Sequence, residues 1–265
     1  MRAFSVACLI YEHASRFMNI PPARNQFIAL RRRRIAESTR EFRARGKSVI
    51  RCDDCQLASY ACICQWRPEL DCRSEFALLM HRDEVLKPTN TGRLIADIFP
   101  RHTHVFCWSR TEPDAELLAM LGDPARRCLI VFPDEANEAA GKSRDLVAEL
   151  PADNKINTFI LLDGTWKQSG RMFHLSRWLD AFPCVVLPEV DGRGYAVRKS
   201  HQENYLSTAE AAALCLDLAG ETSPAETLRD YFELFNVHYL ATRACVPPQP
   251  GDLHRRLGLL TVKFR

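Results

Sequence analysis

The sequence of 265 residues lacks any apolar run long enough to cross a bilayer. Its first eleven residues are mildly apolar, but Glu12 and His13 interrupt them, so we expect no signal peptide. The eleven cysteines lack the regular framework of a small secreted disulfide protein. These absences predict a cytoplasmic protein with reduced thiols and no membrane partner, in which residues 1–22 form a leader before the fold.

Internal repeats are absent too, and there is no G-x-S-x-G motif of the kind that α/β hydrolases carry. What is present is an ordinary globular composition, with 46% hydrophobic and 26% charged residues. A chain of this length and composition can bury a full core in one large domain, alone or with a small module attached.

The net charge of +3 is unevenly distributed along the chain. Residues 24–51 carry +8, whereas residues 52–265 sum to −6. A basic segment attached to an acidic body indicates a polyanionic partner. The alternative is an ordinary solvated helix face that happens to carry an arginine run. We expect a basic helix over residues 23–46, with these candidate RNA-binding residues: Arg31, Arg32, Arg33, Arg34, Arg43 and Arg45.

Four cysteines follow this segment with the spacing C-x2-C-x6-C-x-C, at Cys52, Cys55, Cys62 and Cys64. The first pair has the spacing of a metal-binding turn, and zinc prefers four such ligands in a tetrahedron. A redox pair and reduced surface cysteines remain alternatives. We predict a structural zinc site, in a module over residues 23–68 that also contains the basic helix.

Short apolar runs then alternate with helical patterns, which predicts an α/β domain over residues 69–245 with a mainly parallel sheet. The predicted strands are 75–80, 104–108, 128–132, 158–162 and 184–187. The predicted helices are 91–99, 114–121, 142–150, 166–173, 207–219 and 225–242. Three prolines at 247, 248 and 250 are expected to end regular structure, which leaves residues 246–265 as a tail.

Ligands of open α/β sheets bind beyond the carboxyl ends of the strands. There Asp163, Thr165 and Trp166 offer a base, a hydrogen-bond donor and a stacking surface after the fourth predicted strand. Asn90-Thr91-Gly92 opens a helix, where amides suit an anion, although an ordinary capping turn explains it equally well. Arg198 and Lys199 offer two cations for a phosphate or a carboxylate.

Several motifs together resemble the DTW-domain family. They are D-G-T-W at Asp163, the C-x2-C…C-x-C cluster, K-P-T-N-T-G-R-L at Lys87, W-S-R-T-E-P at Trp108, V-F-P at Val131 and S-T-A-E at Ser207. The set keeps the order of the family and covers residues 24–242. The resemblance implies a tRNA-uridine aminocarboxypropyltransferase, and related ribosomal-RNA enzymes imply a SPOUT-like α/β fold with a knotted C-terminal region.

The same resemblance implies roles for particular residues. S-adenosylmethionine would donate a 3-amino-3-carboxypropyl group to N3 of a tRNA uridine and leave as methylthioadenosine. Asp163, Thr165 and Trp166 would form the catalytic centre. The cofactor would be bound by Thr91, Gly92, Phe132, Pro133, Arg198, Lys199, Ser207 and Thr208. Ser207 also has a purely structural explanation, because Glu210 completes a capping box with it.

Two other functions remain open from the residues alone. A SPOUT-class RNA methyltransferase would use the same donor and substrate class but transfer a different carbon. A non-catalytic zinc-containing RNA-binding protein would bind RNA without affinity for S-adenosylmethionine. The choice between monomer and homodimer, and the identity of the modified tRNA and uridine, are left open by the sequence.

Overall fold

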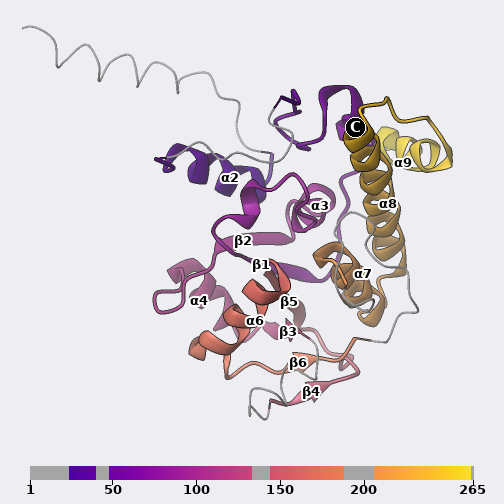
Figure 1. The fold of residues 1–265 in the computed structure, drawn as a ribbon. Helices are drawn as coiled ribbons and strands as arrows, with labels where there is room; N and C mark the ends of the chain where they lie inside the picture. Colours follow the sequence, from indigo (N-terminus) through magenta and orange to yellow (C-terminus); the bar gives the residue numbers. More distant parts are fainter. Residues whose placement is uncertain (1–23, 40–47, 133–143, 188–205, 264–265) are drawn as a thin grey trace, which may run out of the picture.

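The protein was analysed as a computed structural model, which describes residues 24–39, 48–132, 144–187 and 206–263. Within these residues six parallel strands form one sheet in the order β2-β1-β5-β3-β6-β4 (Figure 1). The strands are β1 (Glu75–Met80), β2 (Thr103–Cys107), β3 (Arg126–Val131), β4 (Leu146–Val147), β5 (Ile156–Asp163) and β6 (Cys184–Val185). The predicted α/β class with a parallel sheet is therefore confirmed.

Helices cover both faces of this sheet. They are α2 (Gln26–Ala36), α3 (Gly92–Ile98), α4 (Ala115–Leu121), α6 (Trp166–Leu175), α7 (Thr208–Leu218), α8 (Thr222–Ala244) and α9 (Asp252–Lys263). Four short 3-10 helices complete the elements: η1 (Ser59–Ala61), η2 (Cys64–Trp66), η3 (Glu84–Leu86) and η4 (Arg177–Leu179). No helix of the described segments is both long and apolar enough to span a membrane.

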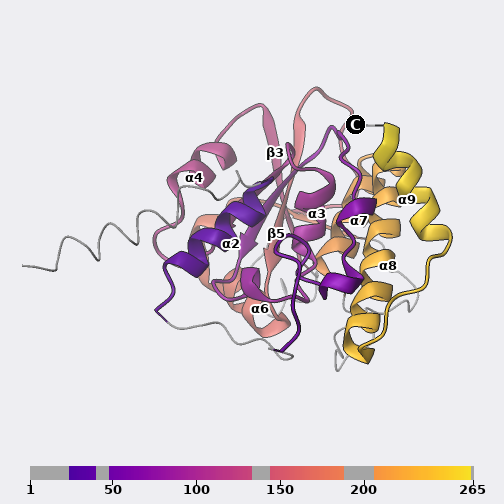
Figure 2. The same cartoon turned by 90° about the horizontal axis from the view of Figure 1, so that it is seen from above.

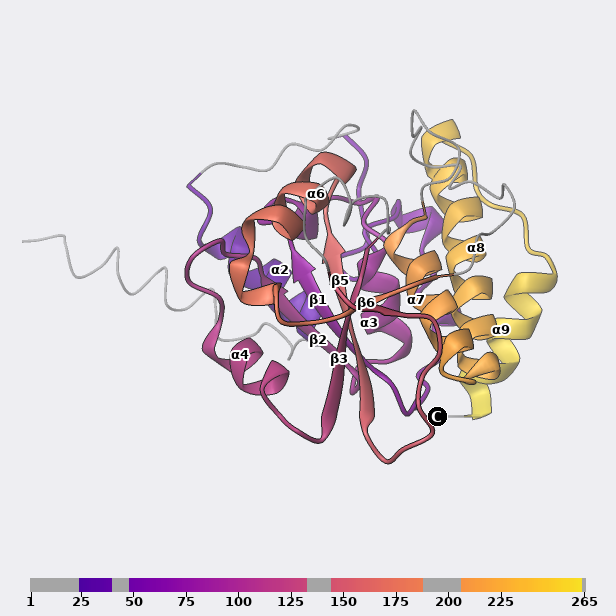
Figure 3. The ribbon, with the colours of Figure 1, turned by 90° about the horizontal axis from the view of Figure 1, so that it is seen from below.

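The central strands are apolar on both sides, and alternate side chains enter two separate cores. Phe76 and Leu78 of β1 pack into a core shared with α3, α7 and α8. Ala77 and Leu79 pack into a second core shared with α4 and α6. Figure 3 shows these two helical layers on opposite sides of the sheet. This double burial explains why the strand positions were recognisable as continuous apolar runs.

Helix α2 lies along the edge strand β2. Asn25 caps the helix, since its side-chain oxygen accepts the N–H of Ile28 at 2.9 Å. Gln26 accepts the N–H of Val105 on β2 at 2.9 Å, and Phe27 is buried in the core. The helix thereby covers part of the exposed edge of the sheet. The expected end near Gly46 lies outside the described residues.

Two predictions of secondary structure are wrong. The helix expected over residues 142–150 is absent from the described part of that range, because Leu146–Val147 pairs with β6 as strand β4. Regular structure does not end after the three prolines either, because α9 follows them and packs along α8 (Figure 2). The expected knot stays a prediction, because residues 188–205, which join β6 to α7, lie outside the described residues.

Two buried histidines join α9 to α8 and to the cysteine module. His254 Nδ1 accepts the backbone N–H of Gly251 at 2.9 Å, so the proton of a neutral His254 ring lies on Nε2. That nitrogen is 2.8 Å from His238 Nε2, and His238 Nδ1 is 2.9 Å from the carbonyl oxygen of Ala61. All three hydrogen bonds are satisfied together only when both rings are neutral. Burial lowers the pKa of both histidines accordingly.

We expect the free energy of unfolding to decrease as the pH falls below about 6.5, the ordinary pKa of histidine in an unfolded chain. Below that pH the unfolded chain binds protons that the folded His238–His254 pair still resists, so stability is lost as the pH falls. Denaturant unfolding at a series of pH values measures this slope. His254→Gln should reduce the slope by up to about 1.4 kcal/mol per pH unit. An unchanged slope would contradict the neutral pair.

Candidate active site and cysteine cluster

The carboxyl ends of β1 and β5 lie side by side, because Met80 pairs with Asp163 in parallel register. The chain leaves β1 toward α3 on one face of the sheet, whereas it leaves β5 toward α6 on the other face. Divergence of neighbouring loops is the topological feature where open α/β sheets bind ligands. The edge of the sheet at Asp163 is therefore the candidate active site.

The side chain of Asp163 is buried, with 2% exposure, and it is held by the turn before α3. The Asn90 amide nitrogen donates to Asp163 Oδ1 and Oδ2, at 3.0 Å each. A Cβ atom added to Gly92 would lie 2.0 Å from Asp163 Oδ2. Only glycine leaves room for the carboxylate at this close approach. The structure thus brings together Asp163 and the Thr91-Gly92 turn, two groups that the sequence analysis nominated separately.

Thr165 begins α6 as its N-cap residue. The Gln168 oxygen accepts both the backbone N–H and the hydroxyl of Thr165, at 2.8 and 2.9 Å. The Gln168 amide nitrogen consequently faces His81 Nδ1, at 3.1 Å, and donates to it. A neutral His81 therefore carries its proton on Nε2, and burial lowers its pKa, which favours that neutral form. This edge of the sheet presents a histidine N–H donor.

Aromatic rings surround the same edge. His81 stacks on Trp108, which follows β2, with ring centroids 6.4 Å apart. Phe132, which follows β3, stacks on Phe173 of α6 at 4.3 Å. Trp166 in the first turn of α6 is 38% exposed. The predicted stacking surface at Trp166 is thus accessible to solvent, whereas Phe132 packs within the protein.

The other predicted cofactor residues have mixed placements. Ser207 caps α7 and forms the expected capping box with Glu210, so its hydroxyl accepts a helix N–H at 3.3 Å. Thr208 follows as the first residue of α7, which packs over β5. The placement of three further residues lies outside the described part of the chain: Pro133, Arg198 and Lys199.

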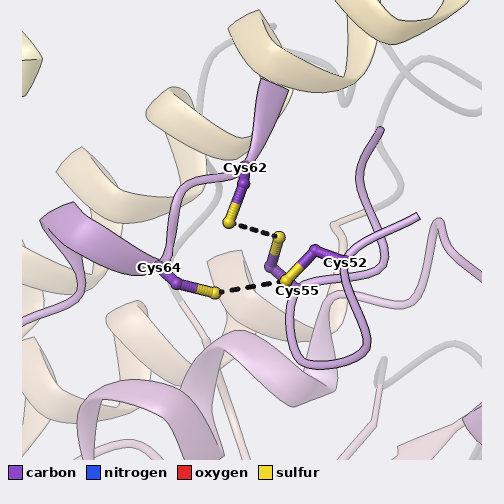
Figure 4. Close-up of side chains that lie close together, drawn as sticks. All are labelled: Cys52, Cys55, Cys62 and Cys64. Carbon is purple, nitrogen blue, oxygen red and sulfur yellow. Dashed lines mark hydrogen bonds between the residues drawn. The ribbon is translucent and has the colours of Figure 1, made fainter. Parts of the chain in front are cut away.

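The four predicted metal ligands converge on one point (Figure 4). Their sulfur atoms all lie within 4.8 Å of one another. The pairs Cys52–Cys64 and Cys55–Cys62 have sulfur–sulfur distances of 3.7 Å. A tetrahedron with zinc–sulfur bonds of about 2.3 Å has an edge of about 3.8 Å. The cluster therefore has the size and the ligand chemistry of a tetrahedral zinc site built from four thiolates.

Hydrogen bonds among these thiols separate their acidities. Cys55 and Cys64 stabilise the Cys52 thiolate and lower the pKa of Cys52. Sharing with the Cys52 thiolate in turn raises the pKa of Cys64, and that of Cys55 to about 12. The first thiolate of the metal-free cluster is therefore Cys52. A thiolate is the form that binds metal.

The turn that carries Cys52 and Cys55 is tied to helix α2. Gln56 follows the turn with a positive φ of 59°, which is uncommon for a residue other than glycine. Its amide nitrogen donates to the carbonyl oxygen of Cys52 at 3.1 Å, and its oxygen accepts from Arg31 Nη2 at 2.8 Å. Arg31, predicted to bind RNA, thus also supports the cysteine turn.

The next arginines of α2 point the positive charge of the helix toward the carboxyl edge of the sheet. Burial raises the pKa of Cys107, at the end of β2, and the charges of Arg34 and Arg33 oppose that shift. Arg33 is exposed, and Arg34 forms an ion pair with Glu37 at 2.9 Å. The predicted residues Arg43 and Arg45 lie outside the described segments.

The sequence analysis missed the groups that connect these parts. Asn90 was seen only as part of a capping turn, and His81 and Gln168 were not nominated. Each follows a strand or opens a helix at the carboxyl edge, which is the one signal that could have found them.

Comparisons with known proteins agree with this assignment of the edge. A family model described as the DTW domain matches residues 49–240. A Drosophila melanogaster protein named tRNA-uridine aminocarboxypropyltransferase 2 is 27% identical over 174 residues, which cover 63% of this chain and 65% of that protein. The match thus spans less than two thirds of that relative. No solved structure matches the chain.

Proposed function

The chain belongs to the DTW domain family, and from this premise we propose that it transfers the 3-amino-3-carboxypropyl group of S-adenosylmethionine to N3 of a tRNA uridine. The relative from Drosophila melanogaster bears the name of that activity. The observation that carries the proposal is the junction of the D-G-T-W segment with the Asn90-Thr91-Gly92 turn around the Asp163 carboxylate.

Bound S-adenosylmethionine would supply an electrophilic carbon next to its sulfonium, and the transfer would join that carbon to N3 while methylthioadenosine leaves. The methyl carbon of the same sulfonium is electrophilic as well. The task of this chain is therefore orientation, since the outcome depends on which carbon faces the uracil ring. A rigid turn held on a buried carboxylate suits that task better than a mobile loop.

The proposed roles follow from the contacts at the edge. Asp163 holds the Thr91-Gly92 turn through Asn90, and its burial supports an orienting role over that of a proton acceptor. His81 offers its Nε2–H to a uracil carbonyl oxygen, which gains negative charge as N3 loses its proton. Trp166 stacks on a ring of the substrate or the donor.

The proposed cofactor contacts beyond this turn are Phe132, Pro133, Arg198, Lys199, Ser207 and Thr208. Among them, Phe132 already stacks on Phe173, and Ser207 already caps α7. Their contribution to the cofactor would then be shape and backbone groups more than new side-chain hydrogen bonds. Thr165 is similar, because its hydroxyl already donates to Gln168.

The test is incubation of the purified protein with undermodified tRNA and S-adenosylmethionine, followed by mass analysis of the nucleosides and of the small product. The proposal predicts an aminocarboxypropyl-uridine and methylthioadenosine. A methylated nucleoside with S-adenosylhomocysteine would identify an RNA methyltransferase instead. Binding of tRNA with no affinity for S-adenosylmethionine would identify a non-catalytic RNA-binding protein.

We also propose that the four cysteines hold a structural zinc ion. The 3.7 Å sulfur–sulfur distances support this metal, and four protein ligands leave no open position for catalysis. Zinc would fix the module beside α2 in a single conformation. Elemental analysis of the purified protein tests this directly. Four freely titratable thiols and no zinc in the native protein would refute it.

RNA binding is proposed for α2 and the adjacent cysteine module. Arginine contacts to phosphates supply affinity that is independent of sequence and sensitive to salt. Tyr60 of the module is 49% exposed, and Ile50 is 81% exposed. An exposed aromatic ring beside cations can stack on an unpaired base.

Arg33→Gln is expected to weaken tRNA binding several-fold and to lower the salt slope of the dissociation constant by about 0.7–0.9. Arg33 is exposed, so the substitution removes charge without removing packing. Arg101→Gln is the matched control, because Arg101 is exposed at the amino end of β2. Filter binding at several salt concentrations measures both variants. Equal effects would argue against a defined RNA surface on α2.

A further inference from the structure

Arg93, in the first turn of α3, has a buried guanidinium group. Its residue exposure is 2%, and its Nε, Nη1 and Nη2 atoms find no hydrogen-bond partner among the described residues. The guanidinium lies 4.9 Å from the centre of the Phe235 ring on α8. A cation–π contact of this kind is weaker than the cost of burying an unpaired charge. The arrangement therefore calls for an anion.

The buried carboxylate in range of Arg93 is already engaged elsewhere. Asp97 Oδ1 accepts from Arg67 at 3.1 Å and from Asn25 at 3.2 Å, and Asp97 Oδ2 accepts from Tyr231 at 3.4 Å. Arg67 also pairs with Asp54 at 3.5 Å. Asp97 thus neutralises Arg67, and Arg93 is left to another negative group.

The cysteine cluster is that negative group. Four thiolates around one Zn²⁺ have a formal charge of about −2, and such a cluster needs cations near it. The field of Arg93 reaches the cluster: the pKa of Cys55, raised chiefly by Cys52, is opposed by Cys64 and by the Arg93 charge. The same charge helps burial to lower the pKa of Arg31 and Arg51, which places Arg93 beside the cysteine turn.

We propose that Arg93 is the counter-ion of the zinc–thiolate cluster and that it couples the metal to the active-site turn. The coupling path is short. The backbone N–H of Arg93 donates to Asn90 Oδ1 at 3.1 Å, and the Asn90 amide nitrogen donates to Asp163 at 3.0 Å. One residue therefore faces the metal with its side chain and the turn with its backbone. Zinc would stabilise the turn although no ligand of the metal belongs to it.

The test compares zinc retention in wild type, Arg93→Met and Arg93→Lys. Arg93→Met should release zinc to a colorimetric chelator at least about 10-fold faster, as is typical when an outer partner of a metal site is lost. Arg93→Lys retains the charge and should stay close to wild type. Arg144→Met is the matched control, because Arg144 is also buried and lies 4.5 Å from the centre of the Phe173 ring. It should release zinc at the wild-type rate.

A second measurement keeps the proposal testable if Arg93→Met does not fold. Removal of zinc from the wild-type protein should increase hydrogen exchange in residues 90–95, while residues 144–147 stay unchanged. Unaltered zinc release in a folded Arg93→Met variant would overturn the counter-ion role. So would a variant that keeps zinc but loses S-adenosylmethionine, since Arg93 would then serve the cofactor. Wild-type protein that binds no zinc refutes the metal itself, a result distinct from an indifferent Arg93.

Discussion

Asp163→Asn is expected to lower the rate of tRNA modification at least about 100-fold, the loss typical when a positioning or charge-stabilising group is removed from an active site. Both oxygens of this carboxylate accept from the Asn90 amide nitrogen. An asparagine has the same shape, but it replaces one acceptor with a donor that faces another donor. The Thr91-Gly92 turn should then lose its anchor while the buried volume stays unchanged. Single-turnover assays on tRNA measure the effect.

A second pair of variants separates orientation from charge. Asn90→Ala removes the donor and leaves the Asp163 carboxylate, so a pure orienting role predicts a loss similar to that of Asp163→Asn. The exchange Asp163→Asn/Asn90→Asp restores one donor and one acceptor across the same contact. Recovery of activity in the exchanged protein would assign orientation as the main role. Wild-type activity in a folded Asp163→Asn protein would remove Asp163 from the catalytic centre.

Gly92→Ala should have the second large effect, with at least a tenfold loss of S-adenosylmethionine affinity. The new methyl group would lie 2.0 Å from Asp163 Oδ2, and this carboxylate cannot move without breaking its bonds to Asn90. Overpacking of this kind costs about 1–3 kcal/mol of stability. Calorimetric titration with S-adenosylmethionine and denaturant unfolding measure the two consequences.

Gly170→Ala is the matched control for that substitution. Gly170 lies within α6, and a Cβ atom at this position would meet no atom within 4 Å. Alanine there should leave cofactor affinity unchanged and stabilise the helix by about 0.5–1 kcal/mol. Equal behaviour of the two alanine variants would show that the close approach of Gly92 to Asp163 has no functional weight.

Much of the sheet was predictable because its strands are buried on both faces. Residues 75–80 were expected as a strand, and β1 has these same bounds. The predicted strand 158–162 falls within the longer β5, whose first residues are only half-buried and thus carry less apolar signal. Local hydrophobicity was sufficient in both cases, because each strand forms a continuous apolar run.

The two wrong predictions failed for physical reasons. Strand β4 contains only two residues, and it exists because β6 offers it a hydrogen-bonding edge. An apolar pattern of that length does not distinguish a strand from a helix. The prolines before α9 were taken as an end of structure. They lie in the loop before the helix, which restarts at Asp252 and packs against α8.

The sequence by itself determined that Asp163 ends a buried strand and that four cysteines have metal-binding spacing, because both properties depend on short stretches of chain. The tertiary structure decided that Asn90 reaches Asp163 across 73 positions of sequence and that Gly92 leaves space for the carboxylate. It also decided that Arg93 is buried beside the cysteine cluster. These contacts depend on strand order and on the paths of the connecting loops, which local patterns of hydrophobicity do not encode.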